Sequence, residues 1–161
     1  MSPELDQHIR EKHHLIFSQR CEMSIGDGWY DIIDILCSNI QSHIESVAKQ
    51  REWNIDWNKC VNDPNYEWDK FGPREERKVP ELVEQVVAGQ IKEKFGTLRF
   101  YYHGGDDYIR GLVSMADAMT SRVCEDCGAP GTARSTKQQR WVKVMCEKHA
   151  FERGYLDETN D

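Results

Sequence analysis

The chain has 161 residues, of which 39% are hydrophobic and 30% charged, and its formal net charge is −7. This length accommodates one domain with a core and a small appended unit. The acidic balance argues against nonspecific nucleic-acid binding, which depends on Lys and Arg neutralising phosphates. No apolar run is long enough to span a membrane, and no secretory signal is visible at residues 1–6, so we expect a cytoplasmic protein.

The first half of the chain predicts two helices and a loop. Residues 3–18 read as a short polar helix, and residues 29–47 form a longer one whose apolar side chains recur every three or four positions, with Asp27 as its N-cap. Residues 51–80 lose this periodicity, which predicts an irregular loop packed onto the body. The aromatic residues of this loop are Trp53, Trp57, Tyr66, Trp68 and Phe71. Packing is the first explanation for them, and a ligand-binding wall is the second.

A hairpin and a third helix follow. Residues 86–103 alternate between apolar and polar around a turn, and Gly96 is the position expected to need a positive φ. Asp106 and Asp107 then cap an amphipathic helix that leads directly into Cys124. We therefore predict an α+β fold, with helices packed on a β-hairpin or a small antiparallel sheet. Residues 1–123 would be the core domain, and residues 124–161 a zinc-ribbon or treble-clef-like element docked on it.

Two pairs of metal-binding residues define that element. The order is C-x2-C, an eighteen-residue gap and C-x2-H, made by Cys124, Cys127, Cys146 and His149. Two close pairs separated by a loop are the arrangement that tetrahedral Zn²⁺ requires. Gly128 follows the first pair, where a left-handed backbone lets amide groups point at the thiolates. Four protein ligands leave no position for a reactive water, so the predicted zinc is structural.

The three remaining cysteines, Cys21, Cys37 and Cys60, form an odd and widely spaced set. Free thiols of this kind are typical of a reducing compartment.

Polar and aromatic groups are dense on the hairpin and just after it. The candidate ligand-binding residues are Lys94, Arg99, Tyr101, His103, Asp106 and Asp107. Arg99 could serve as a planar donor for an anion and Tyr101 as a stacking surface, which would suit a nucleotide-like ligand. The same cluster could serve an enzyme, with His103 and a neighbouring Asp as an acid–base pair. The simpler interpretation is a strand with one solvated face.

A basic run within the ribbon supports a different hypothesis. Arg134, Lys137, Arg140 and Lys143 have no acid among them. They would be the contacts of a nucleic-acid-binding or transcription-associated zinc ribbon, or a solvated hairpin rim.

Several segments together resemble a group of small zinc-knuckle proteins of unknown function encoded by phages and prophages. The resemblance covers most of residues 24–150. It rests on GDGWYDIIDILC (26–37), QIKEKFGTLRFYY (90–102), GGDD (104–107), CEDCGAPG (124–131), Trp141 and CEKHA (146–150). This resemblance implies a genomic setting and no particular mechanism. The chain also resembles, locally, zinc-finger regulators that enter the secondary channel of RNA polymerase. The similarity covers a helix leading into a C-x2-C-G knuckle and a second pair about as far downstream, which here is C-x2-H.

The sequence thus favours a small cytoplasmic accessory protein that acts by binding, and it favours a non-enzyme over an enzyme. Its partner would be a host protein, as for an inhibitor of host defence, or a nucleotide-like ligand. The acidic charge favours a basic protein partner. Nucleic-acid binding and catalysis remain the alternatives, and no membrane association is expected.

Overall fold

The computed structural model describes residues 1–68, 72–135 and 141–157. Over these ranges the protein is α+β, as the sequence predicts, with four α-helices and two small sheets. In chain order the elements are α1 (Pro3–Lys12), β1 (Glu22–Ser24), the 3₁₀ turn η1 (Asp27–Trp29), α2 (Tyr30–Asn62), β2 (Val87–Lys94), β3 (Thr97–His103), α3 (Asp107–Thr120), β4 (Thr132–Ser135), β5 (Val142–Met145), α4 (Glu147–Arg153) and β6 (Leu156–Asp157).

The first sheet has the order β1-β2-β3, with β1 parallel to β2 and β2 antiparallel to β3. The predicted hairpin is confirmed. Its turn places both Phe95 (φ 56°) and Gly96 (φ 81°) in the left-handed region, as a two-residue turn between twisted strands requires. The buried residues Ile91 and Phe100 face each other across the hairpin. They supply the strand side of the core.

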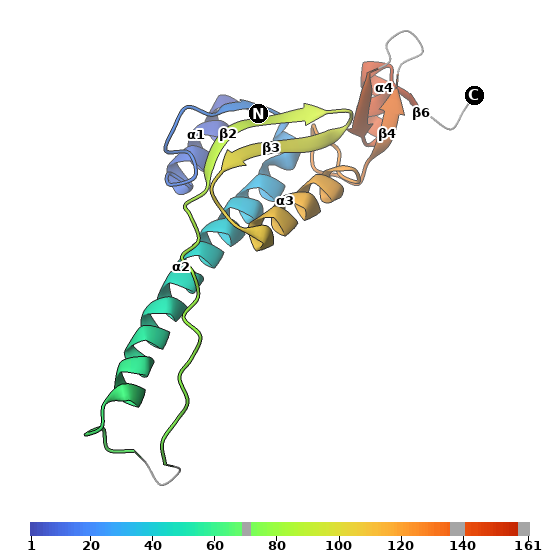
Figure 1. Ribbon diagram of the computed structural model, residues 1–161. Coiled ribbons are helices and arrows are strands. Elements are labelled where there is room, and N and C mark those ends of the chain that lie inside the picture. The colour runs from blue at the N-terminus through green and yellow to red at the C-terminus, as the bar shows by residue number, and fades with distance from the viewer. Residues whose placement is uncertain (69–71, 136–140, 158–161) are drawn as a thin grey trace.

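The core lies between this sheet and helices α2 and α3, which run beneath the hairpin in Figure 1. Trp29 is fully buried at the start of α2. Asp106 caps α3 as predicted, because its carboxylate accepts a hydrogen bond from the Ile109 amide at 3.0 Å. At the other end of α3, the Thr120 hydroxyl accepts the amide of Leu98 at 3.0 Å and so covers a backbone donor of the edge strand β3.

The prediction of a loop over residues 51–80 is wrong for residues 51–62, because α2 continues to Asn62. Figure 1 shows the distal half of α2 projecting away from the body, with the chain returning alongside it toward β2. We call this projection, residues 45–68 and 72–86, the arm. Its apolar periodicity breaks because the helix leaves the core, and within residues 45–62 of the helix the buried side chain is a polar one, that of Asn54. A helix outside the core does not need an apolar stripe.

The N-terminal segment also differs from prediction. The helix ends at Lys12, not near residue 18, although His13 and Ile16 beyond it are still buried. Asp27 does not cap the long helix. It is the first residue of η1, and its carboxylate accepts the Ser2 amide at 2.5 Å, so it joins two N-terminal segments.

The C-terminal unit contains a sheet of order β5-β4-β6. Helix α4 follows β5 in the chain and precedes β6. The central strand β4 pairs with β5 on one side and with β6 on the other, both antiparallel. A small apolar cluster separate from the main core holds this unit together, made of Cys124, Met145 and Ala150. The unit thus consists of a turn, a hairpin and a helix, in that order along the chain.

Candidate metal centre

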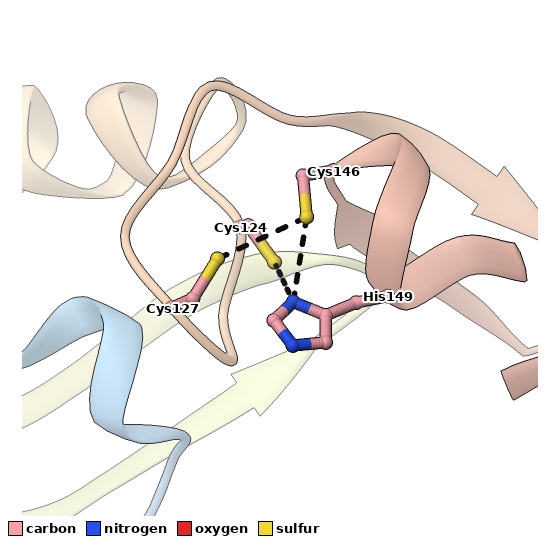
Figure 2. Close-up of side chains that lie close together, drawn as sticks. All are labelled: Cys124, Cys127, Cys146 and His149. Carbon is pink, nitrogen blue, oxygen red and sulfur yellow. Dashed lines mark hydrogen bonds between the residues drawn. The ribbon is translucent and has the colours of Figure 1, made fainter. Parts of the chain in front are cut away.

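The four predicted ligand residues converge at the junction of the body and the C-terminal unit (Figure 2). Cys124 and Cys127 lie in the turn after α3, Cys146 is the N-cap of α4, and His149 lies in that helix. Their ligand atoms all lie within 4.8 Å of one another, so the cluster could hold a metal ion.

The distances between ligand atoms suit a four-coordinate ion. Cys127 Sγ lies 3.8 Å from Cys146 Sγ, and His149 Nδ1 lies 3.3 Å from Cys146 Sγ and 3.5 Å from Cys124 Sγ. A tetrahedron with Zn–S bonds of about 2.3 Å has sulfur atoms about 3.8 Å apart. On the other side of the imidazole, the Glu152 carboxylate lies 4.0 Å from Nε2, beyond hydrogen-bond distance.

The backbone of the first pair forms the predicted knuckle. Gly128 has a φ of 76°, and its amide donates to the Cys124 carbonyl at 2.9 Å. The Cys124 amide in turn donates to the Ala129 carbonyl at 2.8 Å. A residue with a Cβ would be strained at this φ, so glycine is needed for the turn that brings the two thiols to one side.

Amide groups also act on the thiols. The backbone N–H of His149 donates to Cys146 and lowers the pKa of that thiol to about 7. At Cys127 the Ala129 amide acts in the same direction, but desolvation and the neighbouring thiols of Cys124 and Cys146 raise the pKa overall. The start of α4 therefore favours a thiolate at Cys146 even without the charge of a cation.

The knuckle packs directly against the start of α2. A Cβ built on Gly28 would lie 2.2 Å from the Cys124 carbonyl oxygen and 2.3 Å from the Gly128 nitrogen. The Gly28 amide donates to the Glu125 carbonyl at 2.8 Å, and Trp29 Nε1 donates to the Val123 carbonyl at 3.0 Å. No side chain fits between the two segments at this point, so two parts of the chain almost a hundred residues apart are in backbone contact.

Glu125, the residue that follows Cys124, strengthens this junction. It is 5% exposed, and its carboxylate accepts the Gly26 amide at 3.0 Å and Lys143 Nζ at 2.8 Å. The glycines of the GDGW segment (26–29) and Glu125 thus join body and knuckle. Sequence reasoning assigned Asp27 and Trp29 to a helix start and did not find this contact, because nothing local in either segment points to the other.

Five of the six candidate ligand residues on and after the hairpin have partners within the protein. The Arg99 guanidinium lies 3.0 Å from both carboxylate oxygens of Asp117, and Tyr101 lies under the Lys92 ammonium at 5.3 Å. Asp106 accepts from Ile109 and lies 2.8 Å from His43 Nε2. The remaining contacts are local: Asp107 pairs with Arg110 and Lys94 lies over Phe95, while His103 is exposed at the end of β3. A ligand role for this cluster stays a prediction.

The basic run is described only in part. Lys137 and Arg140 lie outside the described residues. Lys143 is paired with Glu125, and Arg134 lies on β4 opposite Lys143 in the register. The Lys143 charge is therefore compensated locally.

Comparisons with protein-family models, with curated proteins and with solved structures gave no match to this chain. Within the described ranges, none of the helices combines the length and apolar character needed to cross a bilayer.

Proposed function

We propose that this chain is a small zinc-binding accessory protein of phage or prophage origin that acts in the host cytoplasm by binding a host protein. The observation that carries the proposal is the convergence of three thiols and one imidazole at the contact between body and knuckle. This convergence supports a structural role for the metal, in which it stabilises the fold that presents the binding surface.

Zinc is the ion that this donor set favours. Three sulfur ligands and one nitrogen at tetrahedral spacing are typical of structural zinc, while hard cations such as Mg²⁺ and Ca²⁺ prefer oxygen. Cys124, Cys127, Cys146 and His149 would fill all four positions. The metal would then hold the turn before β4 against the start of α4, and through Gly28 it would also fix the start of α2.

Two observations favour binding over catalysis. First, the candidate ligand residues on the hairpin are engaged in contacts within the protein. Arg99 contacts Asp117, and Asp106 contacts His43 and Ile109. The arm, in contrast, extends a large surface away from the core (Figure 1). A projecting element with exposed aromatic side chains is typical of a surface that recognises another macromolecule.

The phage setting and a role against host defence rest on the sequence resemblance. Phage accessory proteins act on host components present in the same compartment, and a cytoplasmic setting agrees with the three cysteines outside the metal centre, which are unpaired.

The test has two parts. Elemental analysis of purified protein should give one zinc per chain. Affinity capture from infected and uninfected host lysates, read by mass spectrometry, should recover the same host protein with the wild-type chain and not with an unrelated acidic protein of similar size. A chain without metal contradicts the first part, and no reproducible protein partner contradicts the second.

A further inference from the structure

We infer that the end of the arm is a docking surface for a Lys- and Arg-rich face of a protein partner. This inference rests on the proposed function, because it names the partner's chemistry and the surface that meets it. We call residues 52–68 and 72–77 the arm tip.

The arm is held together by polar contacts in place of an apolar core. The main hydrophobic cluster includes α2 residues only as far as Ile44. Beyond that point, one face of the helix donates side-chain hydrogen bonds to backbone carbonyls of the returning chain. These bonds run from Arg51 to Pro80 (2.6 Å), from Asn54 to Lys78 (2.7 Å), from Asn58 to Arg77 (2.8 Å) and from Trp57 to Glu75 (3.0 Å). These bonds fix the returning segment beside the helix, while the Trp53 and Tyr66 side chains remain exposed.

Those aromatic side chains are held in fixed orientations. The guanidinium carbon of Arg77 lies 4.0 Å from the ring centroid of Trp53 and 4.2 Å from that of Trp57. Tyr66 and Trp68 pack against each other at 4.8 Å, and Trp68 meets Trp57 edge-on at 5.9 Å. Trp53 is nevertheless 60% exposed and Tyr66 45% exposed. Rigid aromatic groups that already stand in solvent lose little side-chain entropy on binding.

The charge around these rings selects a basic partner. Six exposed carboxylates belong to the described arm tip: Glu52, Asp56, Asp63, Glu67, Glu75 and Glu76. The same ranges contain three basic residues, Lys59, Arg74 and Arg77. Lys59 is paired with Asp56 at 2.7 Å, and Arg77 lies over the two indoles. Such an excess of acid repels nucleic acid and a second copy of the chain, and it attracts a cationic surface.

Trp53 adds a specific mode of recognition. One face of its indole already accepts the Arg77 guanidinium, and the exposure of the ring leaves area for a second cation. Cation–π contacts with Lys or Arg of a partner would then lie inside a ring of carboxylates. The partner's charged groups would meet both an aromatic face and an acid, which is more selective than charge alone.

The experiment uses the full zinc-loaded chain and a dye-labelled peptide of alternating arginine and glycine at low ionic strength. The arm variant carries Glu52→Lys, Asp56→Lys and Glu67→Lys. The control carries Glu4→Lys, Glu11→Lys and Asp31→Lys, which change exposed body residues and the net charge by the same amount. We expect the arm variant to lose affinity about tenfold and the control to stay within about twofold of wild type. Trp53→Ala should also lose about tenfold, and Trp53→Phe should retain most of the affinity.

Equal losses in both triple variants, undiminished binding by the arm variant, or no binding by wild type would overturn the inference. Zinc content and circular dichroism of each variant show whether the fold is intact. The same variants applied to the lysate capture separate the two proposals. If the arm variant still captures the host partner, the docking inference is wrong and the proposed function stands. If the wild-type chain captures no host protein, the proposed function itself is wrong.

Discussion

Residues 30–44 of α2 lie in the core, whereas residues 45–62 of the same helix lie outside it. Ile33 and Ile40 in the first half are completely buried, while Trp53 in the second half is 60% exposed. The first half is held by apolar packing and by the knuckle, and the second by hydrogen bonds such as that from Asn58 to the Arg77 carbonyl. One continuous helix therefore joins a region stabilised by burial to a region stabilised only locally.

This difference separates stability from recognition. Apolar burial contributes most of the free energy of folding, and hydrogen bonds near solvent contribute little because water competes for the same groups. The region around the Cys/His cluster is accordingly expected to unfold with the whole protein, and the arm to open on its own. Four predictions test the contrast, from the largest expected effect to the smallest.

Replacing a metal ligand should have the largest effect. We expect Cys146→Ser to lose the metal and to expose residues 124–157 to protease, because site formation and local folding are one process. Segment 24–29 should lose protection as well, since Gly28 contacts the Cys124 carbonyl. The matched control is Cys60→Ser in the arm, which should keep both metal and resistance. Limited proteolysis with zinc analysis decides the matter, and a resistant, metal-free Cys146→Ser protein would refute it.

Gly28→Ala should destabilise the protein by on the order of 3 kcal/mol, because the added Cβ would collide with backbone atoms that cannot move aside without opening the knuckle. Gly111→Ala on α3 is the control, since nothing lies within 4 Å of its Cβ position. That substitution should stabilise by about 1 kcal/mol through helix propensity. Urea unfolding measures both. Similar effects of the two alanines would argue against the close junction.

Asn58→Ala should loosen the arm and leave the body unchanged. Asn58 donates to the Arg77 carbonyl and accepts the Arg77 amide, both at 2.8 Å, so its loss should cost about 1 kcal/mol of local opening free energy. Hydrogen exchange should become faster at residues 75–80, with no change in β2 or β3. Lys59→Ala, one position along the helix and 71% exposed, serves as the control. A global fall in protection would show that the arm is coupled to the core.

The smallest effect concerns pH and the ion pair between α1 and α2. Burial desolvates the Asp34 carboxylate, but Lys12 and His13, each 2.7 Å away, outweigh this and lower its pKa. A lowered pKa contributes stability above the unfolded value of about 3.9, and the contribution disappears as pH falls through the folded value. Asp34→Asn should therefore cost about 1 kcal/mol at neutral pH and flatten the loss of stability below about pH 4. The control is Asp56→Asn, in an ion pair of the arm whose side chains are 71% exposed, and it should change neither the stability at neutral pH nor its loss at low pH. An unchanged loss of stability at low pH in Asp34→Asn would contradict the assignment.

Local patterns in the sequence predicted much of this structure. Gly96 marked the hairpin turn, Asp106 marked the cap of α3, and the spacing of the cysteines with His149 marked the metal cluster. The turn and the cap are each built from residues within a few positions of one another, and the cluster is built from two such close pairs. Such features can be read without knowing the fold.

The parts that were missed depend on contacts distant in sequence or on the absence of a core. The contact between Gly28 and Cys124 joins segments that carry no complementary pattern. The arm was expected to be a loop because helix prediction relied on apolar periodicity, and residues 51–62 have no core to face. The spacing of Arg51, Asn54, Asn58 and Asn62, every three or four residues, was the available signal, and it is a polar one.

The most direct test of the account is hydrogen exchange of the full chain before and after removal of its metal by a chelator. With one zinc bound at the start, protection should fall together in residues 24–29 and 124–131 after removal, while residues 75–80 should exchange at the same rate in both states. Unchanged protection of the knuckle without metal, or loss confined to the arm, would contradict the claim that the metal fixes the start of α2 to the C-terminal unit.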